Sequence, residues 1–359
     1  MTKNNLTQRQ YNLDYLRVFA SIAIILLHVT AQNMPYVELV GTEWNIYNIC
    51  NSASRWGVPV FVMMSGALFL PREIPTKTLY KKYILRMAIA YIVWSLFYAI
   101  ADPIGNMVFT EGYQISFVEI FGNFISGAVH LWFLPMIIGL YMCIPLIKQL
   151  IKKDNLIKYF LILSFVFCFI RTQTELVSVN LLSGNAQIIF EHINTLFKNF
   201  NVTLIFGFST YFILGYYLNK TDIRKKHRTI IYILGVIGLV LTIILNLIAS
   251  KKAGKSLEVF YGGTSANVLL MSIAVFVWFK YNIKGTENLN KIIVNLSKYS
   301  FGAFLVHIFL LKVLHAFGIH STSFHPVLSV PGITIFTTLV SYLISLILNK
   351  IPVIKKYIV

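Results

Sequence analysis

The sequence has few charged residues, few acidic residues and few cysteines. Only 12% of its 359 residues are charged, and 13 are acidic. Soluble domains carry about 25% charged residues, so this composition excludes a soluble globular domain. The three cysteines, Cys50, Cys143 and Cys168, show no C-x-x-C spacing. This absence argues against both a zinc site and a disulfide framework.

Motifs that would identify a soluble enzyme are also missing. The polar segments contain no recognisable nucleotide-binding or triad motif, and His320 and His325 have no paired carboxylate that would suggest a metal site. The first apolar stretch is long enough to span a membrane and no A-x-A-like site follows it, so we predict no cleaved signal peptide. We expect one membrane domain over residues 1–359, without an additional soluble domain.

Apolar residues dominate what is present. They make up 57% of the chain, and the mean hydropathy is +0.71. We therefore predict an all-α polytopic membrane protein with about ten transmembrane helices around a central cavity. The predicted spans begin near Leu13, Ser54, Lys82, His130, Leu156, Leu204, Thr229, Thr264, Ser300 and Ser329.

The net charge of +18 suggests either a nucleic acid or a membrane surface as partner. Most basic residues fall in the N-terminal tail, the C-terminal tail and every second connection between spans, which is the pattern of a positive-inside membrane protein. We therefore expect membrane lipids and no nucleic acid as partners, with both termini in the cytoplasm. The basic residues expected outside are Arg55, Arg171, Lys198, Lys251, Lys252 and Lys255.

The stretch from Leu13 to Gln32 places ionisable residues inside an apolar helix. Arg17 and His28 are eleven positions apart, so in a helix they point within about 20° of each other and are separated by about 16 Å along the axis. Asp14 continues this polar stripe. Ionisable residues at membrane depth favour a functional site. The alternative is that Arg17 reaches the membrane interface and His28 is a packing residue.

Further candidates lie on three other predicted spans. Ser65 belongs to a segment interrupted by glycine and proline, which suits a helix that lines a cavity. His130 is either an interfacial histidine or a second site residue, and Trp132 lies where an aromatic belt is expected. His307 lies mid-membrane and is either structural or part of the site.

A basic connection follows the second span, and it includes Lys82 and Arg86. Lysine and arginine are the natural partners of phosphate groups, so this connection suits a polyphosphorylated cytoplasmic cofactor. The positive-inside rule explains the same residues without a ligand.

Four ordered segments resemble the membrane-bound acyltransferase 3 family. They are LDYLR with the R-x10-H pattern of Arg17 and His28, NSASRWGVPVFVMMSG, HLWFLPMIIGLYMCIPLI and YSFGAFLVHIFLL. The ten-span layout agrees, and the resemblance covers essentially the whole chain. Within the family, the chain most resembles the enterobacterial common antigen O-acetyltransferase branch.

This resemblance implies an O-acyltransferase of the bacterial plasma membrane. It would move an acyl group, usually acetyl, from cytoplasmic acetyl-CoA to a hydroxyl of a cell-envelope glycan or lipid-linked saccharide. His28 would be the catalytic histidine, and Arg17 would help to hold the donor. The family's R-x-x-R pattern is here Tyr83-x-x-Arg86, so Arg86 would contact donor phosphate, with Lys82 as a substitute.

The residue chemistry is compatible with this role. An uncharged His28 can act as a general base on a hydroxyl, or can carry the acyl group itself. Asp14, Ser65, His130, Trp132 and His307 are candidates for the acceptor side or the cavity wall. The competing hypothesis is a secondary transporter or glycan flippase. Transporters commonly show repeated halves, and no counterpart of the LDYLR and His28 pattern occurs after Leu156.

Overall fold

A computed structural model describes residues 9–200, 202 and 207–359, and the described residues contain helices and no strand. Helices are the expected outcome, because the backbone of a membrane span must satisfy its hydrogen bonds internally. The first half comprises α1 (Tyr11–Asn33), η2 (Met34–Tyr36), α2 (Thr42–Ser54), α3 (Gly57–Phe69), α4 (Thr76–Thr78), η3 (Leu79–Ile84), α5 (Leu85–Phe109), α6 (Phe117–Ser126), η4 (Val129–Trp132), α7 (Phe133–Met142), α8 (Ile144–Leu150) and α9 (Asp154–Ser164). The second half comprises η5 (Phe165–Ile170), α10 (Arg171–Leu181), α11 (Gly184–Asn199), α12 (Phe208–Lys220), α13 (Lys225–Ala253), η6 (Val259–Tyr261), α14 (Ala266–Asn282), α15 (Glu287–Ala316), α16 (Pro326–Leu348) and α17 (Pro352–Tyr357).

Eight helical stretches among the described residues are long and apolar enough to cross a membrane. They contain eight of the ten predicted starting positions, and the all-α polytopic class is confirmed. The other two positions correspond to α3 and α12. Each of these helices has 13 residues, which at about 1.5 Å per residue is shorter than a ~30 Å hydrocarbon core. The position at Leu204 itself lies outside the described residues.

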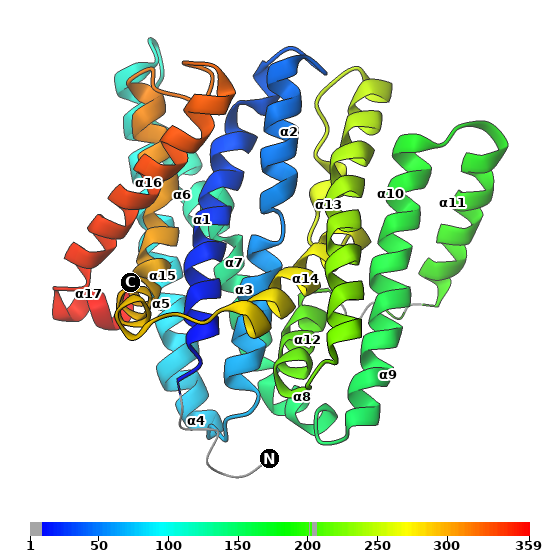
Figure 1. The fold of residues 1–359 in the computed structure, drawn as a ribbon. Helices are drawn as coiled ribbons and strands as arrows, with labels where there is room; N and C mark the ends of the chain where they lie inside the picture. Colours follow the sequence, from blue (N-terminus) through cyan, green and yellow to red (C-terminus); the bar gives the residue numbers. More distant parts are fainter. Residues whose placement is uncertain (1–8, 201, 203–206) are drawn as a thin grey trace.

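Helix α1 occupies the centre of the bundle (Figure 1). It packs against α2, α3, α14, α15 and α16, and it is the most buried of the eight candidate spans. We call the end of the bundle at which α1 begins the basic end, because Lys77, Lys81 and Lys82 precede α5 there. The opposite end is called the far end. Helix α17, close to the end of the chain, lies in the basic half with the start of α1 (Figure 1).

Helices α3 and α12 cross at backbone distance. A Cβ atom added to Gly66 would lie 1.7 Å from the carbonyl oxygen of Phe212, and one added to Gly215 would lie 2.0 Å from that of Met63. Small residues let helices approach closely where lipid supplies no hydrophobic driving force. The pair therefore packs α3 firmly against its neighbours, and α3 in turn packs against α1.

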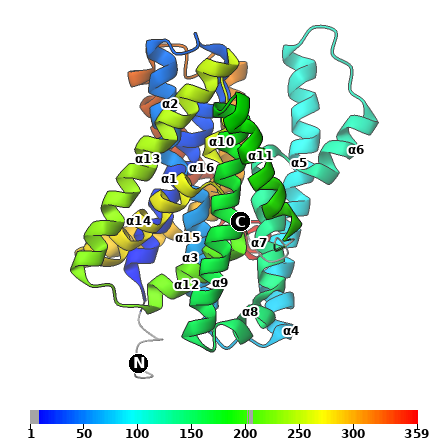
Figure 2. The same cartoon turned by 90° about the vertical axis from the view of Figure 1, so that its right-hand side faces the viewer.

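The predicted outer connection between residues 172 and 201 is helical. Helix α10 continues directly from α9 and η5, and α11 returns beside it, at the flank of the bundle (Figures 1 and 2). Lys252, one of the few basic residues predicted to lie outside the cytoplasm, donates a hydrogen bond to the Leu182 carbonyl at 2.6 Å. It lies in the last turn of α13, where a cation also complements the helix dipole.

The crossing of α3 and α12 predicts a sharp difference between two kinds of glycine. Gly66→Ala and Gly215→Ala should each destabilise the protein by about 1–3 kcal/mol, because the new methyl group overlaps backbone. Thermal unfolding of the purified protein measures this effect. Gly139→Ala on α7 is the control, since nothing lies within 4 Å of its added Cβ. Equal unfolding temperatures for all three variants would contradict the packing described.

Candidate active site

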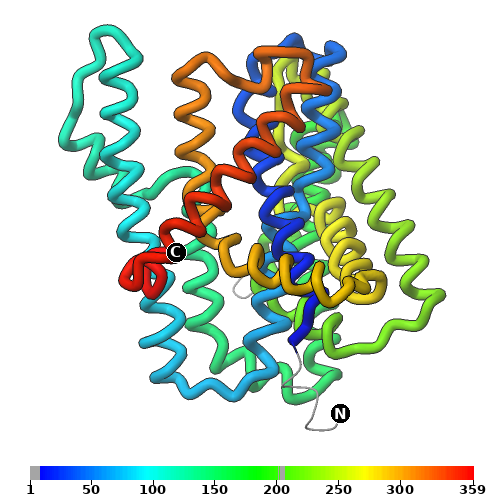
Figure 3. Tube along the Cα trace, turned by 60° about the vertical axis from the view of Figure 1, so that its left-hand side comes forward, coloured from blue at the N-terminus to red at the C-terminus, as the bar shows by residue number. Residues whose placement is uncertain are grey.

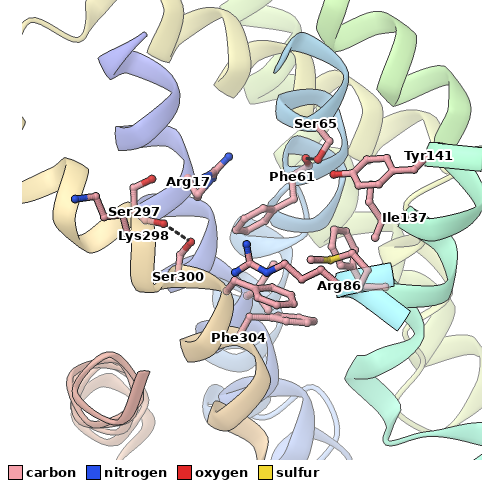
Figure 4. A pocket seen from close by; sticks show the side chains of 14 residues that line it. Arg17, Phe61, Ser65, Arg86, Ile137, Tyr141, Ser297, Lys298, Ser300 and Phe304 are labelled. Carbon is pink, nitrogen blue, oxygen red and sulfur yellow. Dashed lines mark hydrogen bonds between the residues drawn. The ribbon is translucent and has the colours of Figure 1, made fainter. Parts of the chain in front are cut away.

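A cavity of about 260 Å³ lies between α1, α3, α5, α7 and α15 in the basic half of the bundle. Its walls combine polar side chains with aromatic rings (Figure 4). The lining residues are Arg17, Ile24, Phe61, Ser65, Arg86, Met87, Phe133, Ile137, Tyr141, Ser297, Lys298, Ser300, Phe301 and Phe304.

Two arginines face this cavity from opposite helices. Arg17 projects from α1 and Arg86 from α5, while Lys298 points away (Figure 4). No lining residue is acidic, and no aspartate or glutamate of the described chain lies within ion-pair distance of either guanidinium. Arg86 donates at 2.6 Å to a main-chain oxygen of Val359, the last residue of the sequence. Because unpaired charge inside a membrane protein is costly, the unpaired Arg17 in this cavity favours an anionic ligand.

Three histidines meet beyond the cavity, toward the far end. The His28 ring of α1 lies 5.1 Å from the His307 ring of α15, measured between centroids. The His130 ring of η4 lies 5.3 Å from the same His307 ring, again measured between centroids. His307 and His130 are buried, whereas His28 is partly accessible. Three separate chain segments thus bring their imidazoles together.

The hydrogen bonds of His307 determine which of its nitrogens is free. Nδ1 lies 2.5 Å from the Phe304 carbonyl oxygen, and a carbonyl only accepts, so Nδ1 carries the hydrogen. Nε2 is then an acceptor, and it is buried without a hydrogen-bond partner among the described residues. Buried polar atoms are usually satisfied. This nitrogen is therefore suited to receive a proton or a hydrogen bond from a neighbouring group.

His130 shows the same pattern. Its Nε2 lies 3.4 Å from the Leu305 carbonyl oxygen, and its Nδ1 is buried without a partner. His28 makes no hydrogen bond to any described residue. The cluster consequently presents unused imidazole nitrogens in an apolar setting, as proton-transfer chemistry requires.

Phe304 connects the cavity with the histidines. Its side chain lines the cavity, and its ring lies 5.5 Å from His130 and 5.8 Å from His307. Ile24, which also lines the cavity, is one helical turn before His28 on α1. His28 itself does not line the cavity, so a ligand must pass the level of Phe304 to reach it.

A second, basic groove of about 690 Å³ opens at the basic end beside α5 and α17. Arg86 belongs to both the groove and the cavity. The groove walls come from the start of α5, from α17 and from η3, a π-helical segment of the kind often found at functional sites. The lining residues are Lys81, Lys82, Tyr83, Leu85, Arg86, Pro352, Lys355, Lys356 and Tyr357.

Comparison with known protein families identifies the family of the chain. The model described as an acyltransferase domain, that of the acyltransferase 3 family, matches residues 10–346. The chain belongs to the acyltransferase 3 family. No curated protein and no solved structure matches it. The match extends to the family and not to the enterobacterial common antigen branch.

In this acyltransferase, most of the residues singled out in the sequence fall into three neighbouring groups. Arg17, Arg86 and Ser65 line the cavity. The three predicted histidines form the cluster beyond it. Lys82 lines the basic groove.

Two predicted residues, Asp14 and Trp132, belong to none of these three groups. Asp14 is bound to Arg9 at 2.7 Å and accepts a hydrogen bond from Ser297 Oγ, also at 2.7 Å. It therefore holds the start of α1 against α15. Trp132 is 45% exposed and packs on Phe208, with ring centroids 5.4 Å apart.

Other residues of the site have no clear signal in the sequence. Tyr141 and Phe304 are aromatic residues in apolar runs, where aromatic residues are common. Lys355 and Lys356 look like a topology signal, because the C-terminal tail is basic. Only the return of α17 to the start of α5 makes them part of the groove.

The unpartnered Nε2 of His307 predicts a separation of stability and activity in this acyltransferase. His307→Leu should unfold at an unchanged or higher temperature, because a buried unsatisfied acceptor is replaced by an apolar group. Its acyl-transfer activity should fall by about 10²-fold or more, the usual contribution of acid–base groups. Thermal unfolding and activity are measured on the same preparation. His192→Leu, an exposed change on α11, serves as control. Full activity in His307→Leu would exclude a role for this nitrogen.

Proposed function

We propose that this protein is an O-acyltransferase that moves an acyl group, acetyl in the first instance, from cytoplasmic acyl-CoA to a hydroxyl of a cell-envelope glycan or lipid-linked saccharide. The observation that carries the proposal is the pair Arg17 and Arg86, which face one cavity that no acidic side chain lines. Coenzyme A is a polyanion, and arginine is the residue best suited to phosphate groups.

The basic groove supports the same donor. Lys81, Lys82, Lys355 and Lys356 supply four ammonium groups at the basic end. Arg86, which lines both spaces, joins the groove to the cavity. The phosphate-bearing part of coenzyme A would occupy the groove, and its long, thin thioester arm would extend past Arg86 toward the histidines.

The membrane orientation follows from charge. Lysine and arginine are retained in the cytoplasm by the positive-inside rule, so the basic end would face the cytoplasm of a bacterial plasma membrane. Both the start of α1 and α17 would then lie on that side. The far end, with the histidine cluster beneath it, would face the acceptor.

His28 would perform the transfer in one of two ways. As a general base, it takes the proton of the acceptor hydroxyl while the oxygen attacks the thioester carbonyl carbon; the carbon–sulfur bond breaks and coenzyme A leaves as its thiol. As an acyl carrier, an imidazole nitrogen attacks the thioester carbonyl carbon first, and the carbon–sulfur bond breaks so that coenzyme A leaves as its thiol. The acceptor hydroxyl then attacks the acyl-imidazole, the carbon–nitrogen bond breaks, and the ester and free imidazole are formed. In both routes the free Nε2 of His307, which lies beside His28, can orient the His28 imidazole by accepting a hydrogen bond or can accept a proton from it.

Substitutions at the two ends of the α1 stripe should have different effects. His28→Ala should lose at least about 10²-fold in the rate of transfer from radiolabelled acetyl-CoA, because the base or carrier is removed. Arg17→Lys should weaken donor binding, since an ammonium group lacks the planar fork of arginine. Binding of coenzyme A by calorimetry separates the two effects. Absence of any coenzyme A binding to the native protein would refute the enzyme and favour a transporter.

The groove makes a separate prediction about the C-terminal lysines. Lys355→Gln combined with Lys356→Gln should raise the KM for acetyl-CoA several-fold and leave kcat nearly unchanged, because the contacts are the same in the ground and transition states. The effect should shrink as salt rises. Lys350→Gln, a neighbouring lysine that does not line the groove, should behave as wild type. An unchanged KM in the double variant would remove α17 from the donor site.

A further inference from the structure

A third space lies at the far end, on the opposite side of the histidines from the donor cavity. It is a cleft of about 660 Å³ between α5 and α15, and the last turn of α1 contributes to it. The lining residues are Gln32, Ala101, Asp102, Gly105, Asn106, Phe109, Thr110, Phe309, Lys312, Val313, His315 and Ala316. None of them was a site candidate in the sequence, and the family match assigns them no role.

The cleft contains one lysine and one aspartate, whose opposite charges compensate each other. Lys312 Nζ and an Asp102 carboxylate oxygen form an ion pair at 2.5 Å, and their side chains are 44% and 30% exposed. Gln32 and Asn106 add amide groups, which both donate and accept hydrogen bonds. A neutral ligand with many hydroxyl groups fits this combination, because it can bond to both partners of the ion pair without adding an unpaired charge.

The floor of the cleft leads to the histidines. Gln32 follows His28 by one helical turn on α1, so the two lie on the same face. Phe309, which lines the cleft, donates its backbone N–H to the Tyr98 hydroxyl at 3.1 Å. The Tyr98 ring lies 5.1 Å from the His130 ring. A hydroxyl group at the bottom of the cleft is therefore next to the cluster that contains His28.

The sides of the cleft face the lipid. The far half of α5 and the adjoining α6 stand apart from the rest of the bundle (Figures 2 and 3). Their outward side chains are apolar and exposed, for example Val108 at 65%, Phe117 at 80% and Val118 at 79%. All cleft residues come from α1, α5 and α15, except Thr110, which directly follows α5. In Figure 3 no helix crosses in front of the far halves of α5 and α15. The cleft side chains Lys312 and Asp102 are 44% and 30% exposed, so the cleft can be reached from outside the bundle.

We infer that this cleft receives the hydroxyl-bearing headgroup of a lipid-anchored acceptor, which enters sideways from the outer leaflet while its apolar anchor stays between α5 and α15. The inference rests on the proposed function and narrows it, because it excludes a free, water-soluble sugar as the acceptor. Polar groups on the cleft floor and an apolar rim on α5 match the two halves of such an amphiphile.

Gly105 offers a direct test of the cleft. It lines the cleft, and a Cβ atom added there has nothing within 4 Å. The Cβ atom of Gly105→Trp therefore meets no neighbouring atom, and its indole ring is expected to occupy part of the cleft. Gly122→Trp on α6 is the matched control, since its added Cβ is equally free and Gly122 does not line the cleft.

The assay uses everted membrane vesicles that contain the full-length protein, supplied with radiolabelled acetyl-CoA. Vesicles with His28→Ala give the background. We expect the label of the wild type in the chloroform–methanol extract, at least a tenfold loss of that label with Gly105→Trp, and no loss with Gly122→Trp. Coenzyme A binding to purified Gly105→Trp should equal that of the wild type, which shows that the variant is folded.

Two results would overturn the inference. One is transfer of the label by the wild type to an acceptor that is recovered in the water-soluble fraction. The other is full lipid labelling by Gly105→Trp, which would place the acceptor elsewhere. If the wild type transfers label to neither fraction above the His28→Ala background, the proposed function itself fails. The two failures are therefore distinguishable.

Discussion

The site depends on the cost of holding two guanidinium groups inside a membrane protein. Arg17 and Arg86 face one cavity from opposite helices, and no lining residue is acidic. Asp14, the nearest acidic residue to Arg17 along α1, is already bound to Arg9 and Ser297. Since unpaired charge at this depth is unfavourable, the bundle maintains an arrangement that an anion would stabilise. The neighbouring groove extends the same positive field to the basic end.

Helix α1 connects the cavity, the histidine cluster and the far cleft. Arg17 lines the cavity, His28 belongs to the histidine cluster and Gln32 lines the far cleft. These residues share one side of a single helix, so the rigid rise of about 1.5 Å per residue fixes their spacing along the membrane normal. Neighbouring helices complete each level. A soluble enzyme would build such a path from loops, whereas the bilayer permits irregular backbone only where protein or a cavity surrounds it.

Local sequence patterns predicted the helical class and a large part of the site. The spacing of Arg17 and His28 places both on one helix face whatever surrounds them, because the α-helical repeat is fixed. Ser65 was found in a segment interrupted by glycine and proline, Arg86 in a basic connection, and His307 as an ionisable residue at mid-membrane. Sequence patterns also selected Asp14 and Trp132, which the fold uses for an ion pair and for packing. Such patterns identify candidates but do not reveal the partner that each one meets.

The sequence by itself determined a polytopic helical protein and the polar stripe of α1, and its charge distribution predicts that the basic loops lie in the cytoplasm. These properties depend on hydropathy, charge and helical period, which act over a few residues. Tertiary structure alone decided that α17 returns to the start of α5 and that Asp102 pairs with Lys312 across 210 positions. It also decided that the rings of His28 and His130 lie 5.1 Å and 5.3 Å from the His307 ring, measured between centroids. Such contacts depend on how helices pack, and the packing of α3 against α12 through Gly66 and Gly215 shows that it is set by shape complementarity between distant segments.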